Sequence, residues 1–201
     1  MDTVGILGFT RALSKQQQQT TDNRRENTMK TILIYCDGGC SNNGQVNASS
    51  YASYRAFEVL MALPMNTLTA SQEAKLTDLP DTALADLPTT HQPYVTELVH
   101  HTAPLHKAEN DRQTNNTAEA RAMQLAVQWL ATVNYPYTAY LFSDSQLTVN
   151  QAAGIWKTRN KALKEIHGDI QHIGQKACRN GLNKIKLRWV PREYIVPVLG
   201  H

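Results

Sequence analysis

The sequence is poor in cysteine and has no long apolar run, and each scarcity excludes a class of protein. Its three cysteines are odd in number and form no CxxC pair, so a disulfide-built secreted domain is excluded and reduced thiols in a cytoplasmic protein are expected. No apolar run reaches the roughly 20 residues that span a bilayer. Residues 1–28 lack the basic start and full apolar segment of a secretory signal. We therefore expect no membrane partner.

Acidic residues are scarce in the last part of the chain, although the net charge is only +3. Residues 145–201 carry ten Lys or Arg against three Asp or Glu, a net charge of about +7, whereas residues 58–111 carry two against eight, about −6. A strongly basic region suits a polyanion such as nucleic acid. A solvated helix face explains the charge equally well, so charge alone does not decide.

The chain divides into a tail, a domain and an insertion. Residues 1–28 are polar and rich in Gln, Asn and Arg, which predicts a disordered N-terminal extension. Residues 29–201 have the length of one domain, which we expect to be a monomer. Residues 60–93 carry four prolines and scattered acids, which indicates an insertion or long loop, largely mobile, with a short helix at 71–76.

The remaining segments predict an α/β domain. Alternating or continuous apolar residues predict strands at 30–36, 49–59, 94–104, 137–144 and 183–190. Helical periodicity predicts helices at 114–133, 145–154 and 159–178. Residues 37–47 have turn chemistry, so the first two strands should form a hairpin. In the last strand Ile185, Leu187 and Trp189 should face the core. The order gives a mixed sheet with helices.

Three acids stand at the ends of these predicted elements. Asp37 ends the first strand, Glu119 lies in the first turn of the first long helix, and Asp144 ends the fourth strand. Because sequential elements usually lie beside each other, the three should meet at one edge of the sheet. Each acid has an alternative role. Asp37 can open a turn, Glu119 can complete a capping box with Asn116, and Asp144 can cap the next helix.

A cluster of carboxylates needs a cation, because like charges raise each other's proton affinity. Mg²⁺ takes oxygen ligands, including carboxylates and phosphate oxygens, and a pair of such ions catalyses phosphodiester hydrolysis. The three acids therefore predict a magnesium-dependent nuclease.

The motifs DGGCSNNG, TNNTAEARAMQLA and SDSQLTVNQAAGIWK, followed by LRWVPRE, resemble type 1 ribonuclease H in content and order. The similarity covers about residues 30–59 and 95–195. It implies a mixed five-stranded sheet flanked by helices. It also implies two-metal cleavage, with Mg²⁺ or Mn²⁺, of the RNA strand of RNA–DNA hybrids, leaving 5′-phosphates.

The resemblance also assigns residues. Asp37, Glu119 and Asp144 would be the catalytic metal ligands. Residues matching positions that contact the RNA strand are Cys40, Asn43, Asn116 and Gln146, and Thr114 matches a position near a DNA phosphate. Trp156 and Lys157, with Arg159, Lys161 and Lys164, would hold the DNA strand. Against this, Trp156 can be a core residue, the lysines a solvated face, and Asn43 and Asn116 turn or cap residues.

The sequence departs from the family at its last motif. Members usually carry a fourth carboxylate, an aspartate on a final helix, but VPRE is followed only by YIVPVLGH. A missing or truncated last helix is expected, with part of the sheet exposed. His201 falls near the place of that acid, although a histidine there is more often exposed. An alternative function follows: a weakly active or non-catalytic module that binds hybrids.

Overall fold

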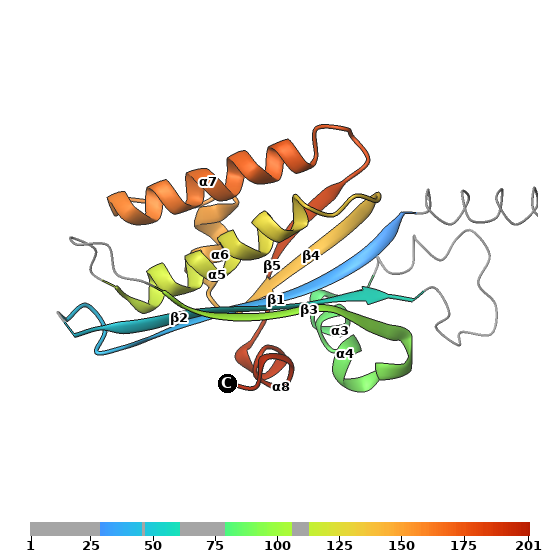
Figure 1. Cartoon of the computed structure of the whole chain (residues 1–201), viewed down its shortest axis with the longest axis horizontal. Helices are drawn as coiled ribbons and strands as arrows, with labels where there is room; N and C mark the ends of the chain where they lie inside the picture. Colours follow the sequence, from blue (N-terminus) through green and yellow to red (C-terminus); the bar gives the residue numbers. More distant parts are fainter. Residues whose placement is uncertain (1–28, 46, 61–78, 106–112) are drawn as a thin grey trace, which may run out of the picture.

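A mixed five-stranded sheet forms the centre of the molecule, as predicted (Figure 1). The computed structural model describes residues 29–45, 47–60, 79–105 and 113–201. The strands are β1 (Lys30–Ser41), β2 (Ser49–Val59), β3 (Val95–Leu105), β4 (Tyr137–Ser143) and β5 (Lys184–Trp189), in the order β3-β2-β1-β4-β5. The first three strands pair antiparallel, whereas β1, β4 and β5 run parallel. The carboxyl ends of β1 and β4 therefore reach the same edge of the sheet.

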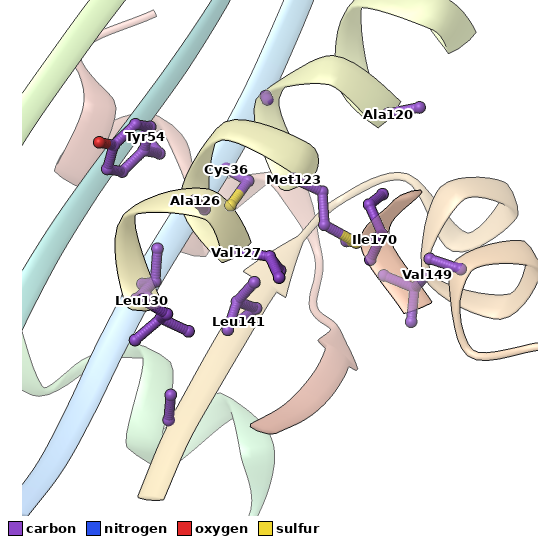
Figure 2. Close-up of a cluster of buried hydrophobic side chains, with 14 of the residues drawn as sticks. Cys36, Tyr54, Ala120, Met123, Ala126, Val127, Leu130, Leu141, Val149 and Ile170 are labelled. Atoms are coloured by element: carbon purple, nitrogen blue, oxygen red, sulfur yellow. The ribbon is translucent and has the colours of Figure 1, made fainter. Parts of the chain in front are cut away.

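Helices α5 (Asn115–Leu130), α6 (Gln146–Ala152) and α7 (Lys161–Ala177) lie together on one face of the sheet (Figure 1). Helix α5 presents small residues such as Ala118 and Ala122 to the strands, so its backbone approaches the sheet closely. The main core lies between them and includes Ile34, Met123 and Leu141, all fully buried. Figure 2 shows Met123 and Leu141 in this core. Burying such side chains supplies the main favourable term in folding.

The opposite face of the sheet is covered, which corrects the expectation of an exposed face. Figure 1 shows short helices there, namely α3 (Asp81–Ala85), α4 (Leu87–Thr90) and α8 (Val196–Leu199), with the 3₁₀ turns η1 (Gln92–Tyr94) and η2 (Arg192–Tyr194). A second core forms around Tyr35 and Phe142, with Leu84 from α3 and Leu199 from α8. The last helix, α8, is a single turn of four residues.

The insertion takes part in this second core. The expectation of a long mobile loop is wrong for residues 79–93, which contain α3, α4 and the first two residues of η1. The Tyr35 hydroxyl donates a hydrogen bond of 2.8 Å to the carbonyl of Ala85, and Arg188 pairs with Asp81 at 2.9 Å. The helix predicted at 71–76 and the tail of residues 1–28 lie outside the described residues.

None of the helices in the described ranges is both long and apolar enough to cross a bilayer.

Candidate active site

Asp37 lies inside β1, because the strand continues through the predicted turn to Ser41. The parallel pairing of β1 with β4 ends at Tyr35, whereas its pairing with β2 continues to Ser41. Asp37 stands two residues beyond the last β1–β4 pair and is only 3% exposed. Its Oδ1 accepts a hydrogen bond of 2.9 Å from the backbone N–H of Gly38. The alternative that Asp37 opens a turn is therefore wrong, since cross-strand pairing holds this segment extended.

Glu119 is free of any capping role. Helix α5 is capped by Thr114, which is extended (φ −136°, ψ 160°) and forms a reciprocal capping box with Thr117. The predicted caps, Asn115 or Asn116, already lie inside the helix. Glu119 therefore falls in the second turn rather than the first, and its capping-box alternative is wrong.

Gly38 brings the first two acids together. A Cβ atom added to Gly38 would come within 2.5 Å of the backbone nitrogen of Glu119 and closer still to the carbonyl of Ala118. Real Cβ atoms do not approach backbone so closely, so only glycine allows β1 to lie directly against α5 here. Asp37 on β1 directly precedes Gly38, and Glu119 on α5 directly follows Ala118, so both acids lie at this contact.

Asp144 directly follows β4, and its carboxylate forms an ion pair with the side chain of Arg192. Its Oδ2 accepts a hydrogen bond of 3.0 Å from Nη1 of Arg192, at the start of η2. Ser145, not Asp144, caps α6, because its side chain accepts from the backbone N–H of Thr148. The indole of Trp189 donates to the Asp144 carbonyl at 3.1 Å and is 46% exposed. The Trp189 side chain is thus partly exposed and hydrogen-bonded to the segment that follows β4, which corrects its predicted place in the core.

The three carboxylates influence one another electrostatically. Burial, and then the charge of Asp144, raise the pKa of Asp37, although Arg192 opposes this shift. Burial raises the pKa of Glu119 to about 7, with further contributions from Asp144 and Asp37, while hydrogen bonds from Ser145 and Thr148 lower it. Asp144 thus raises the pKa of both other acids, so the three carboxylates lie within electrostatic range of one another.

This pKa shift predicts a pH-dependent stability. Glu119 binds its proton more tightly in the folded protein, so the free energy of unfolding should fall as pH rises from about 4.5 to about 7. Glu119→Gln should remove that part of the slope. The measurement is urea unfolding in EDTA between about pH 5 and pH 8, with Glu165→Gln on the exposed face of α7 as the control. A variant slope equal to that of the wild type would refute the assignment.

The donor set suits a hard divalent cation in its chemistry but is not preassembled. Within the described ranges no three His, Cys, Asp or Glu residues are grouped so that they could hold a metal ion as they stand. Asp144 is engaged by Arg192, and Glu119 accepts from the Thr148 hydroxyl at 3.4 Å. The three carboxylates remain a suitable set of oxygen ligands, once Arg192 releases Asp144.

The residues expected to contact RNA lie around the start of α5. The backbone N–H of Cys40 donates to Asn115 at 2.9 Å, and the Asn43 side chain accepts from the Asn115 backbone at 3.3 Å. The loop after β1 is therefore fixed onto the helix that carries Glu119. Asn43 does have the structural role foreseen as its alternative, in a turn. Asn116 is exposed in the first turn of α5, and Thr114 acts as the helix cap.

The remaining predicted contacts lie around α6. Gln146 is exposed as the first residue of that helix. Trp156 is 44% exposed in the loop between α6 and α7, so the alternative that it belongs to the core is wrong. Lys157 is exposed beside it in sequence, and the exposed residues Arg159, Lys161 and Lys164 follow. An exposed indole with adjacent cations is a surface on which a nucleic-acid strand can stack and pair.

Two residues at the site were not found as site residues from the sequence. Arg192, which pairs with Asp144, was seen only as part of the VPRE motif. His201 was expected to be exposed, but its Nε2 is buried and lies 3.7 Å from Oδ2 of Asp37. Tyr51 packs edge-on against its ring, with centroids 4.9 Å apart. His201 approaches Asp37 only because the chain reverses, and such a contact leaves no pattern in the local sequence.

Comparison with known proteins places this geometry in a known fold. No protein-family model matches the chain, and a sequence search of characterised proteins found no match. Solved structures do match. LC11-RNase H1, isolated from compost by a metagenomic approach, is 20% identical with a TM-score of 0.52, over 85% of this chain and 91% of that one. The RNase H1 of Halobacterium salinarum is 16% identical with a TM-score of 0.51, over 84% and 93%.

A second structure of LC11-RNase H1 holds an RNA/DNA hybrid and matches with 19% identity and a TM-score of 0.51, over 83% of this chain and 90% of that one. The chain therefore has the ribonuclease H fold. The fold that the resemblance implied and the fold class predicted from the sequence are confirmed.

Proposed function

On the ribonuclease H fold, we propose that this protein is an endonuclease that hydrolyses the RNA strand of RNA–DNA hybrids. The observation that carries the proposal is the gathering of Asp37, Glu119 and Asp144 at one edge of the sheet, from β1, α5 and the end of β4. Asp37 is buried, and burial together with the charge of Asp144 raises the pKa of both Asp37 and Glu119, an arrangement typical of functional sites.

These carboxylates would hold Mg²⁺, or Mn²⁺ in its place. Divalent ions in such a site activate the attacking water and stabilise the leaving oxygen. The chain's own residues supply the rest. Buried Asp37 is fixed by the N–H of Gly38, and Glu119 is oriented by Thr148. Arg192, which pairs with Asp144, would pair with a phosphate of the substrate.

The substrate would be held on both strands. Amides of Asn116 and Gln146, exposed at the starts of α5 and α6, can both donate to and accept from a 2′-hydroxyl, the group that distinguishes RNA from DNA. Trp156 and Lys157 would hold the DNA strand through stacking and phosphate contacts.

A labelled RNA–DNA hybrid tests the proposal, with single-stranded RNA and duplex DNA as controls, each with Mg²⁺ and with Mn²⁺. Endonucleolytic cuts in the RNA strand of the hybrid alone, leaving 5′-phosphates, are expected. No cutting of any substrate would overturn the proposal.

A second candidate, a module that binds hybrids with little or no cleavage, is favoured by one observation. Arg192 forms an ion pair with Asp144, and the carboxylates of the described residues are not preassembled into a group that could hold a cation. Hybrid binding at nanomolar to micromolar concentration without cutting in either metal would select this candidate.

The Arg192–Asp144 pair predicts how the site responds to metal. Arg192→Gln should tighten Mg²⁺ binding, because the ion no longer competes with a guanidinium and meets a more negative site. Calorimetric titration of the protein with MgCl₂ measures the effect. Arg188→Gln, which breaks the Arg188–Asp81 pair on the other face of the sheet, is the matched control. Equal or weaker Mg²⁺ binding by Arg192→Gln would contradict the prediction.

A further inference from the structure

His201 reaches the site because the chain reverses just before it. Gly200 follows α8 with φ of 86°, in the left-handed region that favours glycine. The reversal directs the ring of His201 between Tyr51 on β2 and Asp37 on β1. The Tyr51 and His201 rings meet edge to face, at 87°. Tyr51 itself is packed over Gly39, where an added Cβ would come within 2.8 Å of the tyrosine ring and hydroxyl. The imidazole is thus held in one orientation.

The held ring leaves one nitrogen without a hydrogen-bond partner. Nε2 of His201 is buried from solvent and accepts or donates no hydrogen bond. Its distance of 3.7 Å from Asp37 Oδ2 is too long for one. A buried polar atom without a partner costs about 1–3 kcal/mol. Orphan atoms of this kind call for an explanation, and an absent ion is one of the few available.

We propose that His201 ligates, through Nε2, the same divalent cation as Asp37. The inference rests on the proposed function, since it assumes that the carboxylates hold a cation. The two atoms lie 3.7 Å apart, a separation that one ion at a coordination distance of about 2.1 Å from each can bridge. Tyr51 acts as a positioning residue, because its ring packs edge-on against the imidazole.

A nitrogen ligand changes which metal the site prefers. Mg²⁺ takes oxygen ligands almost exclusively, whereas imidazole suits first-row transition metals. A site with three carboxylates and one imidazole should therefore favour Mn²⁺ over Mg²⁺ more strongly than an all-carboxylate site would. His201→Asp should reverse part of this preference while keeping four ligands.

The experiment uses the full chain, MnCl₂ as the only added metal, and electron paramagnetic resonance that detects coupling between Mn²⁺ and ¹⁴N. Wild-type protein should show histidine ¹⁴N coupling, and His201→Ala and His201→Asp should lose it. His172→Ala, on the exposed face of α7, should keep it. Mn²⁺ affinity should fall by at least about tenfold in His201→Ala, since even indirect partners of metal ligands cost that much.

Two further outcomes separate this inference from the proposed function. The role of His201 is overturned, and the carboxylate site stands, if Asp37→Asn abolishes Mn²⁺ binding but the wild-type protein shows no ¹⁴N coupling. Coupling that persists in His201→Ala has the same consequence. Mn²⁺ binding that Asp37→Asn does not weaken overturns the carboxylate site, and the role of His201 with it. Circular dichroism of each variant verifies that the fold is retained.

Discussion

Asp37→Asn is expected to abolish hybrid cleavage while making the metal-free protein more resistant to heat. The loss of activity follows because an amide is a poor ligand for a hard cation and Asp37 is the most buried of the three acids. We expect a decrease of about a thousandfold or more, which corresponds to about 4 kcal/mol of transition-state stabilisation.

The gain in stability has a separate origin. Burial and the charge of Asp144 raise the pKa of Asp37, so its ionised form is unfavourable in the folded protein at neutral pH. Asparagine removes that charge, and its side-chain oxygen can still accept the hydrogen bond from Gly38. Each kcal/mol relieved should raise the melting temperature by about 2–4 °C in a chain of this size.

Thermal unfolding in EDTA and cleavage of a labelled hybrid measure the two effects on the same preparations. Asp169→Asn is the matched control, because Asp169 lies on exposed α7 and only accepts a hydrogen bond from Gln124. The control should leave cleavage unchanged. Cleavage retained by Asp37→Asn, or a lower melting temperature in EDTA, would contradict the role assigned to Asp37.

Gly38→Ala is expected to destabilise the fold by about 3 kcal/mol, at the upper end of overpacking effects. The added methyl group meets the backbone of Ala118 and Glu119 rather than a flexible side chain. Backbone cannot move aside without separating β1 from α5, the two elements that carry Asp37 and Glu119. Cleavage should therefore fall together with stability.

Gly168→Ala is the matched control, since it makes the same change in the middle of α7, where an added Cβ meets no atom within 4 Å. There alanine should stabilise the protein by roughly 0.5–1 kcal/mol, through helix propensity. Urea unfolding of both variants gives the comparison. A Gly38→Ala protein as stable as the wild type would show that β1 and α5 are not in direct backbone contact.

The elements themselves could be predicted because their signals are local. The alternation in 49–59 and the helical periodicity of 159–178 are present in adjacent residues, and each predicted strand and long helix is observed. The predicted class and sheet type are correct for the same reason. Boundaries were less accurate where a partner decides them. Pairing with β2 extends β1 through residues that by themselves form a turn.

The small helices of the insertion could not be predicted from their own sequence. Segments of four or five residues such as α3 and α4 are too short to be stable alone. They form because Leu84 and Leu87 are buried against Phe142 and its neighbours on the sheet. The same packing explains why a chain with only one turn of final helix still covers that face.

The sequence by itself determined the strands and the long helices, because their signals come from residues close together in the chain. It also showed that three acids stand at or near the ends of these elements. Tertiary structure alone decided what those acids face. Arg192 meets Asp144 from 48 residues away, and His201 reaches Asp37 across most of the chain. Such contacts depend on the packing of distant segments, for which a single sequence carries no local pattern.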